Sequence, residues 1–128
     1  MTNATVSGLV LGKIYYFAAT TYDVVNQESK FSNEASYAVT KPTLTIVSPT
    51  LNQQWSNGTF TVTGNAGDNV AVGHVFYSLN GSHWTNATTA NNWTNWSGPV
   101  VLTPGTNTLQ AYALDSSGNP STLSLIHI

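Results

Sequence analysis

The sequence predicts an all-β protein whose strands pair in antiparallel sheets and pack as a sandwich. Short stretches rich in Val, Thr, Tyr, Phe and Trp alternate apolar with polar residues, as in "TFTVTGN", where Phe60 and Val62 stand between threonines. Clusters of Gly, Asn, Pro and Asp separate these stretches, and no apolar stripe persists at helical spacing. Such alternation gives each strand one buried face and one face in water, which is typical of antiparallel sheets.

The first part of the chain predicts three strands, at about residues 4–7, 13–22 and 33–39. In "IYYF", Tyr15 and Phe17 fall on one face of the strand and Tyr16 falls on the other. The stretch "LVLG" that precedes this strand has a counterpart in "LTPG" later in the chain, so we expect Gly12 and Gly105 to hold equivalent turns.

Pro42 marks a domain boundary, because it follows a completed strand and cannot donate to a β-ladder. The chain has 128 residues, enough for one full domain and a remnant, since domains commonly have about 100 to 150 residues. We therefore expect an incomplete domain over residues 1–41 and a complete sandwich over residues 42–128.

The second part predicts seven strands at the spacing expected of a sandwich, at about residues 43–47, 59–64, 71–79, 83–88, 93–102, 106–114 and 121–127. Their inward positions give the expected core: Leu44, Ile46, Phe60, Val62, Val75, Tyr77, Leu79, Trp96, Leu109, Ala111 and Ala113. Phe76 and Tyr112 then lie on outer faces, where we expect them to mark a contact with a neighbouring module.

The stretch "SGLVLGKIYYFAATTYDVVNQESKFSNEASYAV" resembles the last third of a fibronectin type III domain. Tyr15, three residues past Gly12, stands where that family has its tyrosine corner, which implies that the phenol hydroxyl holds the turn through nearby backbone. The resemblance covers about residues 4–39 and lacks the family's opening strands. It implies three strands of an incomplete fibronectin type III sandwich, poorly stable alone.

Residues 42–128 resemble a bacterial Ig-like domain through "LTIVSP", "FTVTGNAGDNVAVGHVFYSLNG" and "LTPGTNTLQAYALDSSGN". This resemblance implies an Ig-like antiparallel β-sandwich from a secreted or cell-surface bacterial protein, acting as a non-catalytic spacer or adhesion module whose partners are neighbouring domains. The closing "LSLIHI" fits the family poorly and gives His127 no functional weight. We expect the chain to be a fragment of a longer protein.

Composition argues against several other functions. Only 6% of residues are charged, the net charge is −2, and Lys13, Lys30 and Lys41 are the only Lys or Arg residues, so we expect no nucleic-acid partner. The absence of Cys removes disulfides, thiol nucleophiles and thiolate metal sites. No apolar run approaches the roughly 20 residues of a membrane span, so we expect no membrane insertion.

Catalytic and metal-binding patterns are weak. The five acidic residues each lie in or next to a predicted turn or strand end, and the histidines His74, His83 and His127 lack the spacing of a zinc site or a relay. We expect no enzyme activity and no cofactor. A calcium site in the loops that carry Asp68 and Asp115 remains open, since oxygen ligands could gather there.

The stretch "NNWTNWSGP" allows two interpretations of its Trp pair. Residues 93 and 96 fall on opposite faces of one strand, so we expect Trp96 in the core and Trp93 exposed with Trp84. Sugar C–H groups stack on indole much as other apolar surfaces do. The alternative function is therefore a carbohydrate-binding module that uses Trp84 and Trp93 to hold a polysaccharide, with three polar partners: Asn86, Asn91 and Asn92.

Overall fold

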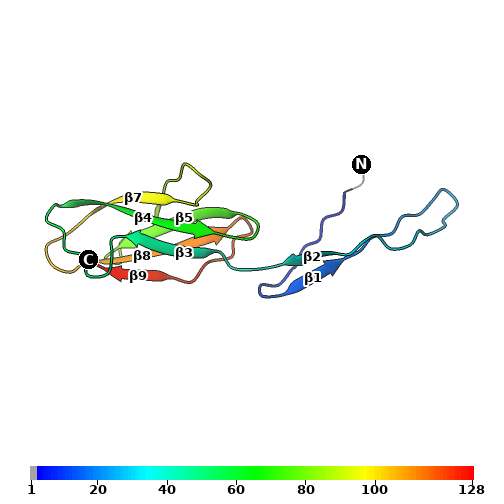
Figure 1. Cartoon of the computed structure of the whole chain (residues 1–128), viewed down its shortest axis with the longest axis horizontal. Coiled ribbons are helices and arrows are strands. Elements are labelled where there is room, and N and C mark those ends of the chain that lie inside the picture. Colours follow the sequence, from blue (N-terminus) through cyan, green and yellow to red (C-terminus); the bar gives the residue numbers. More distant parts are fainter. Residues whose placement is uncertain (1–2) are drawn as a thin grey trace. The chain divides into compact units, whose positions relative to one another are not determined.

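The computed structural model describes residues 3–128 and divides the chain into two compact units, the first ending at Thr40 and the second running from Lys41 to Ile128 (Figure 1). Every regular element of the described residues is a β-strand, and all strand pairs are antiparallel. The predicted all-β class is thus confirmed.

The first unit contains a two-stranded sheet of β1 (Ile14–Phe17) and β2 (Ala35–Ala38). Tyr15 lies opposite Tyr37 in this sheet. Beyond β1, the two segments that follow β1 and precede β2 stay in contact through isolated interactions such as the Tyr22–Glu28 bridge. Residues 4–7 do not form the expected strand. A strand needs a neighbour to satisfy its backbone, and the described part of this unit pairs no other segment with residues 4–7.

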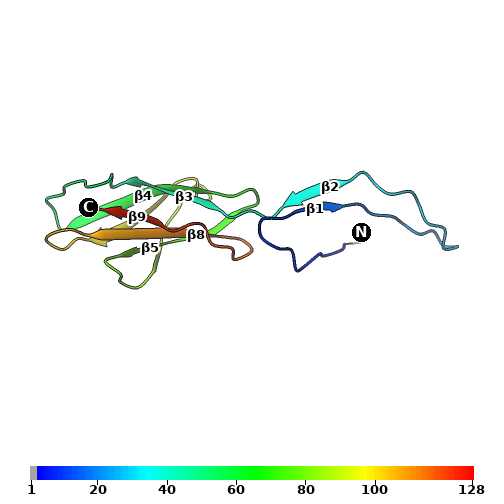
Figure 2. The ribbon, with the colours of Figure 1, turned by 90° about the horizontal axis from the view of Figure 1, so that it is seen from below.

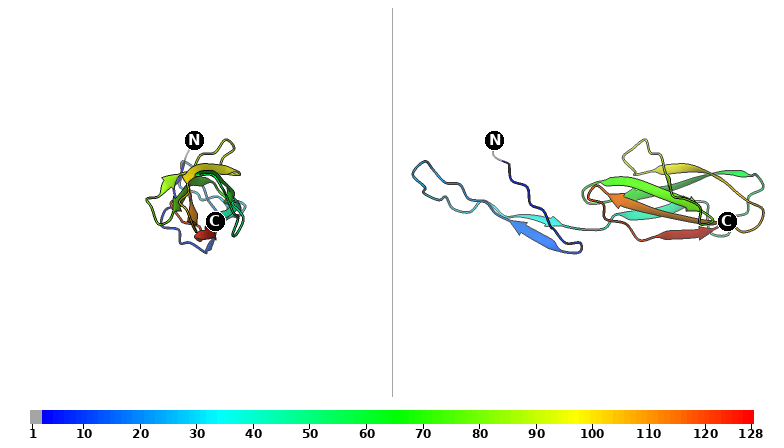
Figure 3. Two further views of the ribbon diagram at one scale, coloured as in Figure 1. Left: turned by 90° about the vertical axis from the view of Figure 1, so that its left-hand side faces the viewer. Right: turned by 180° about the vertical axis from the view of Figure 1, so that it is seen from behind.

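The second unit is a sandwich of two sheets. Figure 2 shows β8 and β9 running side by side in one sheet, and Figure 3 shows the unit from its end and from behind. The three-stranded sheet has the order β3 (Thr43–Ser48), β4 (Thr59–Gly67) and β7 (Trp96–Val101). The four-stranded sheet has the order β6 (Thr85–Asn86), β5 (Val72–Leu79), β8 (Thr108–Asp115) and β9 (Ser124–His127).

The core lies between the two sheets and follows the predicted alternation. Along β8 every second residue is buried, and Val62 of β4 and Val75 of β5 are fully inaccessible. All eleven residues of the predicted core either belong to the buried cluster or pack against it, and Trp96 is only 2% exposed. Burial of this row on each sheet is the main force that holds the sandwich together.

Several of the predicted strands are shorter than the sequence suggested. In the first unit, the strand expected over residues 13–22 ends at Phe17, and the one expected over residues 33–39 is reduced to Ala35–Ala38. In the second unit, three strands are clearly shortened. The strand expected over residues 93–102 begins only at Trp96, because Asn92 and Trp93 have φ angles of 53° and 70° and so lie in the left-handed region that no strand can use. The strand expected over residues 83–88 is reduced to the two residues of β6, and that expected over residues 121–127 begins at Ser124.

The closing residues complete the second sheet, although by sequence they fit their family poorly. They form β9, and Ile126 packs against the core. His127 lies opposite Thr108, and Ile128 exchanges two backbone hydrogen bonds with Asn107, each 2.9 Å long. These residues are therefore part of the sandwich.

Candidate functional site

Five aromatic side chains contact one another in a continuous row that runs from the loop before β7 across the outer face of the four-stranded sheet. In order along this aromatic row they are Trp93, His74, Phe76, Tyr112 and Trp84. The centroids of successive rings are 6.4, 5.8, 5.4 and 4.9 Å apart. The row is therefore the largest aromatic feature of the second unit outside its core.

The alternation of side chains along β5 and the register between neighbouring strands explain why the middle residues of the aromatic row lie on one face of the sheet. His74 and Phe76 are two residues apart on β5 and so share its outer face, and Phe76 pairs directly with Tyr112 of β8. Asn86 of β6 pairs with Phe76 on the other side, so Trp84, two residues before Asn86, falls on the same face. Phe76 and Tyr112 thus lie on the outer face, as the sequence predicted.

Trp84 and Trp93 are not neighbours, contrary to the expectation of an exposed pair. They occupy opposite ends of the aromatic row with three rings between them, and only Trp84, at 42% exposure, is clearly open to solvent. Trp93 is half-buried and packs against the core from the loop before β7. A flat platform made by these two indoles is therefore absent from the second unit.

The asparagines that the sequence placed beside these indoles are also dispersed. Asn86 is exposed, with its Nδ2 atom 3.5 Å from Nδ1 of His74. The Asn91 carboxamide oxygen accepts from the backbone N–H of Asn95 and holds its own loop, and Asn92 is exposed in that loop. Asn86 alone is thus positioned beside the middle of the aromatic row.

Tyr15, Gly12 and Gly105, which the sequence assigned to turns, all lie in or next to a turn before a strand. The hydroxyl of Tyr15 accepts a hydrogen bond of 2.8 Å from the backbone N–H of Val10, the kind of contact a tyrosine corner makes. Gly12 and Gly105 have φ angles of 79° and 95°, a region that favours glycine, and each lies in the turn before a strand.

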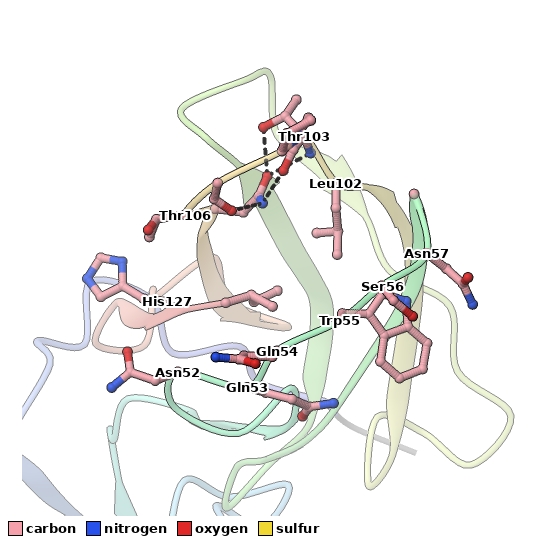
Figure 4. A pocket seen from close by; sticks show the side chains of 15 residues that line it. Asn52, Gln53, Gln54, Trp55, Ser56, Asn57, Leu102, Thr103, Thr106 and His127 are labelled. Atoms are coloured by element: carbon pink, nitrogen blue, oxygen red, sulfur yellow. Dashed lines mark hydrogen bonds between the residues drawn. The ribbon is translucent and has the colours of Figure 1, made fainter.

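A second feature is a hollow at the end of the second unit where the loop after β3 and the loop after β7 meet the last residues of the chain (Figure 4). This end hollow has a volume of about 610 Å³ and is lined by residues 52–58, residues 102–107, His127 and Ile128. In Figure 4 the Gln54 and Leu102 side chains lie towards its middle, between Trp55 on one side and His127 on the other.

The wall of the end hollow formed by residues 102–107 is held by one buried side chain. Asn107 is 2% exposed, and its carboxamide oxygen accepts from the N–H and the hydroxyl of Thr103, each at 3.0 Å. Its amide group donates to the carbonyl oxygens of Thr103 and Gly105. Asn80 adds a further bond of 2.9 Å from the neighbouring hairpin, so hydrogen bonds from two asparagine side chains hold this loop in place.

Sequence reasoning missed Trp55 and the end hollow. Trp55 lies in "NQQWSNG", a stretch with no strand periodicity, and the two loops that form the hollow are far apart in the sequence. The one available signal was the composition of this stretch, in which a single Trp stands among four amide side chains.

In the part of the chain that the structure describes, His, Asp and Glu side chains nowhere gather in a group of three that could hold a metal ion. Burial by itself would raise the pKa of Asp115, but hydrogen bonds from the Asn119 side chain and the backbone of Asn119 and Ser117 outweigh it and lower the pKa. Both carboxylate oxygens of Asp115 are occupied by its own turn.

Residues 42–111 match the profile of the bacterial Ig domain. The chain belongs to the bacterial Ig domain family. Domains of this kind are typically non-catalytic modules of larger proteins and are common in extracellular and surface proteins. Among residues 3–128 of this family member, no helix has the length and hydropathy needed to span a bilayer.

Two solved structures are similar to this bacterial Ig protein. The fibronectin(III)-like modules of CbhA from Clostridium thermocellum match with a TM-score of 0.58 and 17% identity, over 96% of this chain and 64% of theirs. The sulfane dehydrogenase SoxCD from Paracoccus pantotrophus matches with a TM-score of 0.56 and 21% identity, over 80% of this chain and 27% of its own. These identities show a shared fold alone, and this chain spans less than two thirds of either protein. No curated protein sequence is significantly similar to it.

Proposed function

We propose that the chain is a spacer or adhesion segment of a larger secreted or cell-surface bacterial protein. Residues 1–41 would be the last strands of a fibronectin type III domain, followed by the Ig domain. The observation that carries the proposal is the short connection between the units, since only residues 39–42 separate β2 from β3 and include Pro42. A short segment with proline restricts the angle between two modules and so sets a distance between the domains that it joins.

The exposed apolar residues of the first unit support its assignment as part of a larger domain. Val24 is 102% exposed and Phe31 is 76% exposed, and Val39 is the one apolar side chain of residues 3–40 that is buried. Two strands rarely form a stable unit in water without further strands to cover them. The opening strands of a fibronectin type III domain would supply that cover.

The spacer function is tested by measuring the distance distribution between the two units. The chain has no Cys, so spin labels can be attached to Ser36→Cys on β2 and Thr61→Cys on β4 without competing thiols. By pulsed electron paramagnetic resonance, we expect the distance distribution of the native chain to be narrower than that of a variant with a Gly-Gly-Ser insert after Lys41, since motion within the first unit broadens both alike. A native chain that is already as broad as the insert variant would refute a fixed spacing.

Carbohydrate binding by the aromatic row is the second candidate. It is favoured by the exposure of Trp84 beside Tyr112 and by the exposed amide of Asn86 next to the row. Affinity gels with soluble polysaccharides and pull-down with insoluble ones test it. Retardation that is lost in Trp84→Ala or Trp93→Ala would support this function, and retardation by none of the polysaccharides would exclude it.

A further inference from the structure

We infer that the end hollow binds a neutral saccharide, with Trp55 as the stacking surface and Gln54 as the main hydrogen-bonding side chain. This inference goes beyond the spacer function, which requires no ligand. It also concerns a different surface from the aromatic row, because none of the five residues of that row lines the hollow.

Trp55 is held in place before any ligand binds. Its Nε1–H donates a hydrogen bond of 2.9 Å to the carbonyl oxygen of Thr59, and its ring meets Phe60 edge-on with centroids 4.8 Å apart and planes at 89°. The indole nevertheless stays 46% exposed. A rigid, open aromatic ring suits the apolar C–H face of a sugar, because little side-chain freedom is lost on binding.

Trp55 also stands between two openings. Besides the end hollow, it lines a neighbouring hollow of about 490 Å³ that extends along Thr59 and Pro99. A ligand with several linked rings could therefore continue past the indole in either direction. This arrangement favours an oligosaccharide or polysaccharide over a small compact molecule.

Unused hydrogen-bonding groups surround the end hollow. The side chains of Asn52, Gln54 and Asn57 line it and make no hydrogen bond to any residue that the structure describes. Each of these amides offers two donors and one acceptor, which matches sugar hydroxyls that both donate and accept. Figure 4 shows Gln54 directed towards the middle of the hollow, so its amide is the best placed of the three.

The charge of the end hollow selects a neutral ligand. No Lys, Arg, Asp or Glu lines it, and Nδ1 of His127, its single titratable side chain, already lies 3.1 Å from the hydroxyl of Thr108. An anionic ligand would leave water without gaining an opposite charge, and it would be repelled by the α-carboxylate of Ile128 in the 128-residue chain. The volume of about 610 Å³ falls within the roughly 300–1,000 Å³ of small-molecule sites.

The test is affinity electrophoresis of the full 128-residue chain in gels that contain soluble neutral polysaccharides: hydroxyethyl cellulose, xyloglucan, galactomannan, arabinoxylan and soluble starch. We expect at least one to retard the chain and Trp55→Ala to weaken that affinity at least about tenfold, as loss of an aromatic stacking contact does. Alginate and polygalacturonate, which are anionic, should not retard it. Retardation by no neutral polysaccharide overturns the inference.

Two further variants separate a lost contact from a lost fold. Gln54→Ala removes an exposed side chain without internal hydrogen bonds, so it should fold normally and still weaken binding. Gln110→Ala removes the same amide from the outer face of β8, outside the hollow, and should bind as the native chain does. Full binding by both Trp55→Ala and Gln54→Ala, or loss of binding in Trp84→Ala instead, places the saccharide elsewhere and overturns the inference.

Discussion

The indole of Trp96 lies directly on the backbone of Gly64, its partner across the β4–β7 ladder. A β-carbon at position 64 would overlap both this ring and the carbonyl oxygen of Thr45. Trp96 fills the core between the two sheets only because its partner has no side chain, so the two residues act as one packing unit.

Gly64→Ala should destabilise the second unit by about 2 kcal/mol or more, because the Thr45 backbone cannot move aside without breaking its own ladder. Gly58→Ala is the matched control, since nothing lies within 4 Å of a β-carbon there, and we expect a change within about 0.5 kcal/mol. Urea unfolding followed by circular dichroism measures both. Equal stability of the two variants would show that Trp96 does not need this glycine.

Trp96→Phe should be tolerated far better than Trp96→Ala. The indole Nε1 of Trp96 is buried without a partner among the described residues, so Phe removes an unsatisfied donor while keeping most of the ring. We expect Trp96→Phe to stay within about 1.5 kcal/mol of the native chain and Trp96→Ala to lose about 3–5 kcal/mol. A loss for Phe as large as that for Ala would imply that Nε1 finds an acceptor in solution.

Asp115 should make the second unit less stable at acidic pH. Hydrogen bonds from Asn119 and Ser117 lower its pKa in the folded state despite burial. The ionised carboxylate therefore contributes its full stability above the unfolded pKa of about 3.9, and this contribution is lost as pH falls through the lower folded value. In Asp115→Asn, urea midpoints should be lower near neutral pH and should fall less between about pH 4 and 2. Parallel pH profiles of the two proteins would contradict this.

Proteolysis should remove the first unit before the second. Tyr15→Phe deletes the acceptor of the Val10 N–H and should speed cleavage within residues 3–40, leaving a resistant fragment that begins near Lys41. Tyr16→Phe is the matched control, since Tyr16 is 62% exposed on the other face of β1. Thermolysin digestion followed by mass spectrometry measures both rates. A first unit as resistant as the second would contradict the assignment of residues 1–41 to an incomplete domain.

The alternation of apolar and polar residues along single strands predicted most of the sandwich. When a sheet has one buried face, every second residue of each strand is buried and therefore apolar. Phe60, Val75 and Ala111 were placed in the core on that ground and are all buried. The method failed where a segment leaves the strand region. The backbone of Trp93 is in the left-handed conformation, so Trp93 is not part of a strand. The rule that strand side chains alternate between two faces therefore could not predict where Trp93 points relative to Trp96.

The candidate sites could not be predicted from the sequence, because they are formed by contacts between segments that are far apart along the chain. The aromatic row requires the register between β5 and β8, which joins Phe76 to Tyr112. The end hollow requires two loops that no short-range signal connects. Residues 4–7 show the opposite failure, since a short apolar and polar alternation predicted a strand that pairs with none of the other described residues of this unit.

The reciprocal bonds between Ile128 and Asn107 fix where the polypeptide leaves the sandwich, at the rim of the end hollow. A purification tag, fluorophore or fusion protein attached after Ile128 would emerge at the rim of the end hollow and compete with a ligand for the opening. Recombinant versions intended for binding assays should therefore carry a carboxy-terminal label only if it can be cleaved away.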